Sequence, residues 1–308
     1  MFGRRMKFFY MMALALALVS CGSGSGEGGS SEPLSVIQGR VNRIYLVVFE
    51  NASYDEVVGA AYMPFWNSLA SQYAVATNYF ANVHPSIGNY FMMTTGQIIS
   101  QDDNFAGTIA DDNIVRELLL AGKTSRLYAE SLPSPGYLGP DAYPYLRQHD
   151  PFAYLTDVIA SPTTYLRPFS EFATDVAQGT AASFNFIVPN AIDDAHDCPD
   201  GSSSCDISVR LATADAWLQA NIGPLLQQPG FQSGGLLIVA FDESETTDTA
   251  NGGGHIAVLV VGSAVKRGFQ STAFHQHQSL YRLINELLGV NPLPGPAASA
   301  PDMLEFFR

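Results

Sequence analysis

Five short runs of apolar residues recur along the chain, and helical patterns lie between them. The runs are residues 43–49, 125–129, 183–188, 236–241 and 256–261. Runs of this length, rich in Val and Ile, are typical of strands that are buried on both faces of a parallel sheet. The helical patterns cover roughly residues 63–72, 89–95, 113–121, 209–228 and 277–288. This alternation predicts an α/β fold with a doubly wound, central parallel sheet.

Polar residues follow four of the predicted strands. They are Glu50 and Asn51 after the first, Glu130 after the second, residues 189–196 after the third, and Asp242 and Glu243 after the fourth. Turn-forming Asp and Asn would account for any one of these strand exits. Ligands of open α/β sheets bind beyond the carboxyl ends of the strands. The whole set therefore predicts one site at one edge of the sheet.

The chain beyond the N-terminal leader is predicted to form one domain. Residues 131–182 are less regular and rich in Pro, Gly and Tyr. We expect them to be an excursion that partly walls the site. No internal repeat and no long linker follow residue 35, so a single domain over 36–308 is predicted.

The N-terminus has the pattern of a signal peptide. Arg4, Arg5 and Lys7 precede an apolar stretch at residues 8–19, which is too short to span a membrane comfortably. Leu-Val-Ser-Cys at residues 18–21 resembles a bacterial lipobox. An ordinary secretory signal with a chance cysteine is the alternative.

A Gly/Ser-rich stretch after Cys21 favours the lipoprotein interpretation, because this composition forms flexible tethers. We expect residues 1–20 to be the signal peptide, Cys21 to be lipidated and residues 21–35 to be the tether. The protein would then be anchored to a membrane of the cell envelope. By resemblance to Gram-negative lipoproteins, the absence of Asp at position 22 favours the outer membrane over retention at the inner one, and the periplasm is the other compartment we expect.

Cysteine content and charge restrict the chemistry further. Only Cys198 and Cys205 lie beyond the leader, in a polar loop, and an isolated pair in an exported protein predicts a disulfide. The formal net charge is −14 and no basic stripe offsets it, so nucleic acid is excluded as a partner.

Residues 84–96 (HPSIGNYFMMTTG) hold the strongest candidate for chemistry. Ser86 follows a proline and precedes a helix-compatible run that closes on Gly96. A serine hydroxyl is a weak nucleophile unless a base or a metal activates it. Our hypothesis is that Ser86 is a nucleophile at a helix start, and that Glu50 and Asn51 help to hold an activating metal.

Seven motifs together resemble the bacterial phosphoesterase family of the alkaline phosphatase superfamily, which contains acid phosphatases and non-haemolytic phospholipases C. They are residues 50–55 (ENASYD), 84–90 (HPSIGNY), 95–96 (TG), 149–152 (HDPF), 189–196 (PNAIDDAH), 241–243 (FDE) and 277–280 (HQSL). The resemblance extends over about residues 41–306. It implies an alkaline phosphatase-like three-layer sandwich with a central, mostly parallel sheet.

The resemblance also implies a single divalent metal ion and its ligands. These are Glu50, Asn51, Ser86, Asp242 and Glu243. The superfamily more often has Asp-His where this chain has Asp242-Glu243. Losing a nitrogen ligand shifts the preference from zinc toward calcium, magnesium or manganese, and the metal stays open among these four. The family also often has proline where this chain has Gly88, which we expect to loosen the turn slightly.

Phosphate-binding and proton-transfer roles fall to Asn89 and the histidines. Asn89 is expected to donate its side-chain amide to a phosphoryl oxygen. His84 and His149 are expected to contact phosphate or orient neighbours, and His277 to support the site from behind. His196, with Asp194, and His255 are candidates to bind phosphate oxygens or protonate the leaving group. A second metal bound by Asp194, His196 and His255 is the alternative, as in two-metal members of the superfamily.

We therefore expect a metal-dependent hydrolase of phosphate monoesters that acts through a phosphoserine intermediate. A phospholipase C-type phosphodiesterase is the first alternative, with a phospholipid headgroup in place of a small phosphorylated substrate. A lipoprotein that binds a phosphorylated ligand without turnover is the second. The sequence leaves the oligomeric state open.

Overall fold

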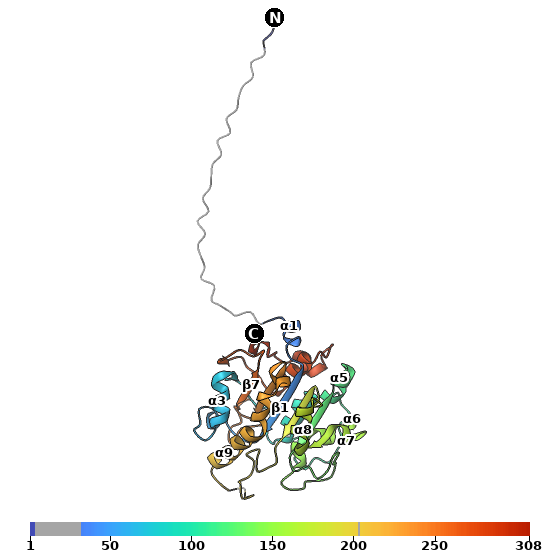
Figure 1. The fold of residues 1–308 in the computed structure, drawn as a ribbon, viewed down its shortest axis with the longest axis vertical. Helices are drawn as coiled ribbons and strands as arrows, with labels where there is room; N and C mark the ends of the chain where they lie inside the picture. Colours follow the sequence, from blue (N-terminus) through green and yellow to red (C-terminus); the bar gives the residue numbers. More distant parts are fainter. Residues whose placement is uncertain (4–31, 203) are drawn as a thin grey trace. The chain divides into compact units, whose positions relative to one another are not determined.

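The computed structural model describes residues 1–3, 32–202 and 204–308 (Figure 1). Most of the predicted signal peptide, the lipidation site Cys21 and most of the tether lie outside the described residues, and all three stay predictions. Residues 32–308 belong to one compact unit. Across the described ranges, no helix combines the length and the apolar character needed to cross a bilayer.

One eight-stranded sheet forms the centre of this unit (Figure 1). The strands are β1 (Arg43–Phe49), β2 (Ala74–Ala76), β3 (Ser125–Ala129), β4 (Leu166–Pro168), β5 (Phe184–Val188), β6 (Gly235–Phe241), β7 (Val258–Gly262) and β8 (Phe269–Ser271). Their order across the sheet is β4-β3-β5-β1-β6-β7-β2-β8. Only β7 runs antiparallel to its neighbours among these strands. The predicted α/β fold with a central, mostly parallel sheet is confirmed.

The five predicted strands match β1, β3, β5, β6 and β7 to within two residues. The three-residue strands β2, β4 and β8 were not predicted, because so few positions carry no readable pattern. The direction of β7 also escaped prediction, since a buried strand has the same apolar run in either direction. Because β7 is antiparallel, its beginning lies at the edge where the parallel strands end.

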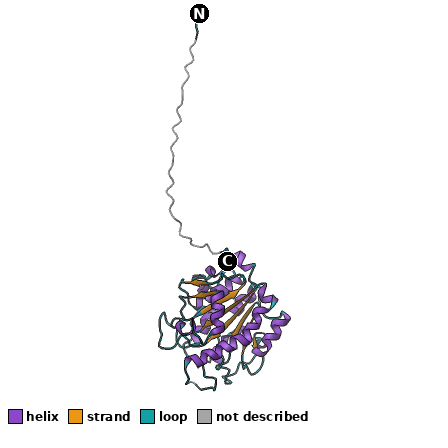
Figure 2. Cartoon of the chain, turned by 60° about the vertical axis from the view of Figure 1, so that its left-hand side comes forward, coloured by secondary structure: helices purple, strands orange, loops and turns teal. Residues whose placement is uncertain are grey.

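Helices cover both faces of the sheet, as a three-layer sandwich requires (Figure 2). They are α1 (Leu34–Gln38), α2 (Tyr54–Val57), α3 (Pro64–Gln72), α4 (Ile87–Thr95), α5 (Ile114–Leu120), α6 (Thr156–Ile159), α7 (Pro162–Tyr165), α8 (Phe172–Gln178), α9 (Ile207–Trp217), α10 (Pro229–Gln232), α11 (His277–Leu287) and α12 (Gly295–Ser299). One group consists of α4, α5 and α11, which contact one another, and a second contains α3 and α9.

The predicted helix over residues 209–228 is interrupted in the structure. It runs as α9 to Trp217, continues as a π-helical turn over Leu218–Ile222, and ends as a 3-10 helix over Gly223–Gln227. Pro224 lacks a backbone N–H and so cannot continue the α-helical hydrogen bonds. The apolar spacing alone did not reveal this change.

A buried carboxylate joins α9 to α3. The side chain of Asp215 is almost fully buried, and its two oxygens accept hydrogen bonds from the N–H groups of Phe65 at 2.9 Å and Trp66 at 2.7 Å. These N–H groups lie in the first turn of α3, where no intrahelical acceptor is available. Burial raises the pKa of Asp215, and the two hydrogen bonds oppose that rise.

We expect Asp215→Ala to lower the free energy of unfolding by about 2 kcal/mol, because it leaves one buried and one part-buried N–H group of the first turn without an acceptor. Asp215→Asn retains one acceptor oxygen and should cost less. Urea unfolding monitored by circular dichroism measures both changes. Equal stability of the alanine variant and the wild type would contradict the capping role.

Candidate active site

The site is built at the ends of three adjacent strands, β5, β1 and β6. The chain just beyond β1 stays paired to both neighbours: the N–H of Glu50 donates to the carbonyl of Asp194 at 2.8 Å, and the N–H of Asp242 donates to the carbonyl of Phe49 at 2.9 Å. The carboxylates of Glu50, Asp194 and Asp242 are completely buried. Polar strand exits that are distant in sequence are therefore brought together at one edge.

Ser86 occupies the N-cap position of α4, a helix that ends at Gly96 with φ of 72°. Its side chain is 5% exposed, and Oγ donates to Oε2 of Glu50 at 3.0 Å. The expectation that Gly88 loosens this turn stays a prediction, and the structure shows close packing at this position. A Cβ at Gly88 would lie 2.9 Å from Cγ2 of Val83 and 3.1 Å from the carbonyl oxygen of Ser100. Glycine therefore allows the following loop to pack closely against the start of α4.

Asn89 is held by contacts other than those we expected. Its Nδ2 donates to the carbonyl of Val83 at 2.8 Å and to Oε2 of Glu243 at 3.3 Å. Its Oδ1 accepts from the N–H groups of Asn82 and Val83. The side chain is fully buried, so its amide hydrogens are engaged within the protein. These contacts favour a role in fixing the turn that leads into Ser86.

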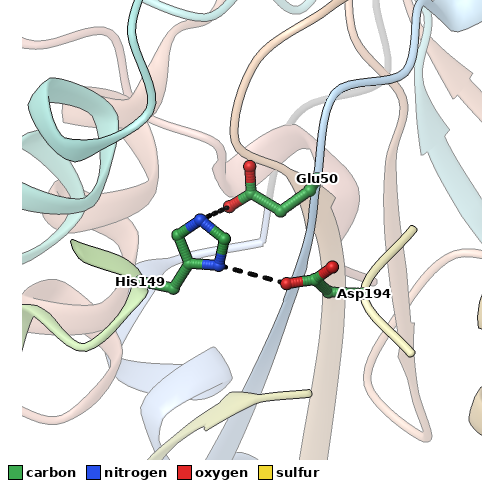
Figure 3. Close-up of side chains that lie close together, drawn as sticks. All are labelled: Glu50, His149 and Asp194. Carbon is green, nitrogen blue, oxygen red and sulfur yellow. Dashed lines mark hydrogen bonds and ion pairs between the residues drawn. The ribbon is translucent and has the colours of Figure 1, made fainter. Parts of the chain in front are cut away.

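His149 lies between Glu50 and Asp194, as Figure 3 shows. Its Nδ1 is 3.1 Å from Oδ2 of Asp194, and its Nε2 is 3.3 Å from Oε1 of Glu50, without hydrogen-bond geometry at Nε2. Tyr90 donates its hydroxyl to the same Oε1 at 2.6 Å, and its ring stacks on that of His149. The irregular region between β3 and β4 thus supplies one residue that reaches the centre of the site.

Two overlapping groups of atoms suit a metal ion. The ligating atoms of Glu50, His149 and Asp194 all lie within 4.8 Å of one another, and this buried group could hold a metal ion. The predicted oxygen ligands form the second group. In it, Asn51 donates from Nδ2 to Oε1 of Glu243 at 3.1 Å and from its backbone N–H to Oδ1 of Asp242 at 3.4 Å.

The second group contains acceptors without donors. Oδ1 of Asn51 and Oδ2 of Asp242 are buried and have no hydrogen-bond partner among the described residues. A buried carboxylate or amide oxygen without a donor is costly unless a cation contacts it. Asn51 also has φ of 38°, a left-handed conformation that Asn adopts more readily than most residues. The residues present therefore fit a divalent cation with oxygen ligands.

The carboxyl groups are strongly perturbed. Burial, together with the charges of Asp242 and Asp194, raises the pKa of Glu50 well above its usual value. Burial raises the pKa of Asp242 to about 6 and that of Asp194 to about 8, and burial with repulsion from Asp242 raises that of Glu243 to about 10. Negative charge at this site therefore needs compensation by a cation.

Burial has the opposite effect on His149, whose pKa it lowers to about 3. The neutral ring is therefore the favoured form of His149 in the metal-free site.

The other expected histidines lie at different distances from the centre. Nδ1 of His84 is 3.1 Å from Oε2 of Glu243, without hydrogen-bond geometry, and its Nε2 contacts the carbonyl of Asp248. His196 is more exposed, bonds to Asp197 at 2.9 Å, and has its ring centroid 5.5 Å from that of His149.

His255 and His277 are engaged outside this cluster. The ring of His255 stacks between Tyr54 and Phe80, and its Nε2 contacts the carbonyl of Thr77. Among the described residues, the group of side chains close enough to share a metal ion is Glu50, His149 and Asp194, and it does not include the alternative second-metal ligands His196 and His255. Nε2 of His277 lies 2.6 Å from the backbone carbonyl of Asp242, behind the site as expected.

Sequence reasoning gave Tyr90 no role. Its position four residues after Ser86 on a helix places both side chains on one face, and that spacing was a usable signal.

Cys198 and Cys205 form a disulfide beside His196 and Asp197.

The chain is similar in sequence to a protein family and to named relatives, and similar in fold to solved structures. The model of the phosphoesterase family matches residues 59–291. A Mycobacterium tuberculosis protein named phosphatidylinositol-3-phosphatase is 30% identical over 266 residues, covering 86% of this chain and 82% of that protein. An Aspergillus fumigatus acid phosphatase is also 30% identical, over 85% of this chain, which spans only 58% of the fungal protein.

A solved structure of an alkaline phosphatase superfamily protein from Vibrio parahaemolyticus has the same fold. It superposes with a TM-score of 0.62 at 12% identity, covering 85% of this chain and 70% of that one.

We expect a divalent cation to stabilise this protein more at about pH 8 than at about pH 5. Raised carboxyl pKa values mean that the folded protein retains protons that the unfolded chain releases above about pH 4. In the presence of chelator, the protonated carboxyl groups therefore contribute to the free energy of unfolding at low pH. This contribution is lost as the pH rises through their folded-state pKa values of about 6 to 10. A bound cation replaces those protons.

Melting curves with chelator and with saturating calcium, magnesium, manganese or zinc measure this effect. A rise of about 5 °C in the melting temperature at the higher pH is expected for the preferred ion. Asp242→Asn should reduce the rise. A cation response that is equal at both pH values would contradict this account of the site.

Proposed function

Because the chain belongs to the phosphoesterase family and is a hydrolase of phosphoric esters, we propose that it hydrolyses phosphate monoesters through a phosphoserine at Ser86. The observation that carries this proposal is the position of Ser86. Its hydroxyl lies at the start of a nine-residue helix and donates to a buried carboxylate, Glu50, at 3.0 Å. A nucleophile beside a proton acceptor is the arrangement that covalent catalysis requires.

The names of the relatives support a monoester as the substrate. The mycobacterial and fungal proteins are named as phosphatases, one for a phosphoinositide and one without a specified substrate. We extend the phosphatase activity, and not a particular substrate, to this chain. A small phosphorylated molecule and a phosphorylated lipid headgroup both present the same phosphoryl group.

We propose that the oxygen set holds a single divalent cation. Glu50, Asn51, Asp242 and Glu243 are its ligands from the strand ends, together with Ser86. Two of these residues have buried oxygens without a protein donor, and the set contains no nitrogen, which favours calcium, magnesium or manganese. When bound, such an ion neutralises phosphoryl oxygens and lowers the pKa of the serine hydroxyl.

The side chains of the site then have separate tasks. Glu50, fixed by Tyr90, accepts the hydroxyl proton as Oγ of Ser86 attacks phosphorus. An ionised Asp194 can only accept a hydrogen bond, so it holds the proton of His149 on Nδ1 and directs Nε2 toward Glu50. The bond from phosphorus to the leaving oxygen breaks. That oxygen takes up the serine proton, which Glu50 passes to Nε2 of His149, or a proton supplied by His196. Water then cleaves the phosphoserine and restores the hydroxyl.

Ser86→Ala should lower kcat for p-nitrophenyl phosphate by at least about 1000-fold without unfolding the protein. Acid quenching of the wild type with labelled substrate should leave phosphate on Ser86. Ser100→Ala, at a serine in the loop that packs on α4, is the matched control and should retain activity. Turnover of Ser86→Ala near the wild-type rate would remove Ser86 as the nucleophile. Faster hydrolysis of phosphatidylcholine than of the monoester would favour the phospholipase C alternative.

Asp194→Asn should lower kcat by about 100-fold with a smaller change in KM, because an amide can donate to Nδ1 and select the wrong tautomer of His149. Steady-state kinetics at fixed metal concentration measure the split between kcat and KM. Asp193→Asn changes the neighbouring carboxylate, which contacts Asn190 instead, and serves as the control. Equal effects of the two substitutions would contradict the orienting role of Asp194.

A further inference from the structure

Asp103 lies against the start of α4, next to the nucleophile, and has no part in the mechanism described above. Its Oδ1 accepts a hydrogen bond from the N–H of Ile87 at 3.3 Å. This N–H belongs to the residue that follows Ser86. It is the group that an oxygen of a phosphoryl group attached to Oγ would meet at the helix start.

The other N–H groups of this first turn are engaged locally. The N–H of Gly88 points to the carbonyl of Pro85 at 3.4 Å, and that of Asn89 donates to the carbonyl of Ser86 at 2.9 Å. The N–H of Ile87 is thus the first-turn donor that faces a side chain. A contact of 3.3 Å is long for a charged acceptor, so an incoming phosphoryl oxygen can displace it.

The loop that carries Asp103 is fixed to the nucleophile turn at several points. Nε2 of Gln101 donates to the carbonyl of His84 at 3.1 Å, and the carbonyl of Ser100 packs close to Gly88. Further along, the ring of Phe105 packs edge-on against that of Phe91 in α4. Asp103 is therefore held beside Ser86 by its own loop.

The side chains around Ser86 are rich in carboxylates, so the additional charge of Asp103 has a marked effect on the binding of an anionic phosphoryl group. Glu50, Asp194 and Glu243 have ion-pair partners, and within the described ranges these partners are histidines, with no lysine or arginine. The charge of Asp103 contributes to the raised pKa of Glu243, which places it within electrostatic range of the predicted ligands. One divalent cation does not neutralise this number of carboxylates.

We propose that Asp103 is a specificity-determining residue that makes the site favour singly charged phosphoryl groups over doubly charged ones. A phosphoryl oxygen that approaches Ser86 must replace or lie beside the Asp103 carboxylate. The repulsion grows with the charge of the incoming group. The proposal rests on the proposed function, since it assumes that the phosphoryl group binds at Ser86. It deepens that function by naming the charge state of the preferred substrate.

Two ligands that differ by one methyl group and by one unit of charge test this. Phenylphosphonate carries two negative charges at slightly alkaline pH, and its monomethyl ester carries one. Their dissociation constants are measured by calorimetry on the metal-loaded protein, which makes the readout independent of turnover. Asp103→Asn removes the charge and keeps an oxygen that can accept from Ile87. Asp102→Asn removes the same charge from the adjacent exposed residue and is the matched control. Among the described residues, the Asp102 carboxylate accepts hydrogen bonds from Asn104 alone.

We expect Asp103→Asn to lower the dissociation constant of phenylphosphonate by about tenfold and that of its monomethyl ester by about threefold. The difference arises because the dianion experiences twice the repulsion. Asp102→Asn should change neither by more than about twofold, as expected for a screened surface charge. If Asp103→Asn does not fold, Asp103→Ser removes the same charge.

Equal changes for both ligands, or weaker binding of the dianion, would overturn the charge-selection role while leaving the phosphatase function intact. Failure of every protein to bind either ligand would overturn this inference and also count against phosphoryl binding at Ser86. Failure of the proposed function alone is a different outcome, in which the ligands bind as expected but Ser86→Ala retains full activity.

Discussion

The pairing of β1 with β5 on one side and β6 on the other is the constraint on which the rest of the site depends. Val47 is in register with Ile187 and with Val239. Hydrogen bonding continues past the strand ends, where Glu50 donates to Asp194 and Phe49 accepts from Asp242, and it fixes the end of β1 against the two neighbouring exits. A shift of one residue in either pairing would move the carboxylates to the opposite face of the sheet, because side chains alternate along a strand.

This rigid frame holds groups that would otherwise repel one another. Glu50, Asp194 and Asp242 are buried within a small space, and Asn51 has a left-handed backbone conformation. Such an arrangement is unfavourable for the isolated protein and persists only when the surrounding structure maintains it. The apolar strands and the two helix layers provide that support. The electrostatic strain is the physical reason why the site suits a cation.

Segments outside the sheet complete the chemistry. The irregular excursion between β3 and β4 supplies His149, and the loop after α4 supplies Asp103. Loops can vary without disturbing the core, so they are suited to setting selectivity on a fixed frame. In the mechanism that we propose, the strand ends provide nucleophile activation and cation ligands, and the loops add proton transfer and charge discrimination.

The sequence by itself determined the longer strands, their alternation with helices, and the polar residues at their exits. A strand that is buried on both faces needs a continuous run of apolar residues, and parallel strands end at one edge of the sheet. Both features can therefore be recognised from short stretches of the sequence. Only the tertiary structure decided the direction of β7, the internal engagement of Asn89, the stacking of Tyr90 on His149 and the absence of His255 from the described Glu50–His149–Asp194 group. The physical reason is that residue patterns record burial and periodicity, whereas hydrogen-bond partners depend on which distant segments the fold places in contact.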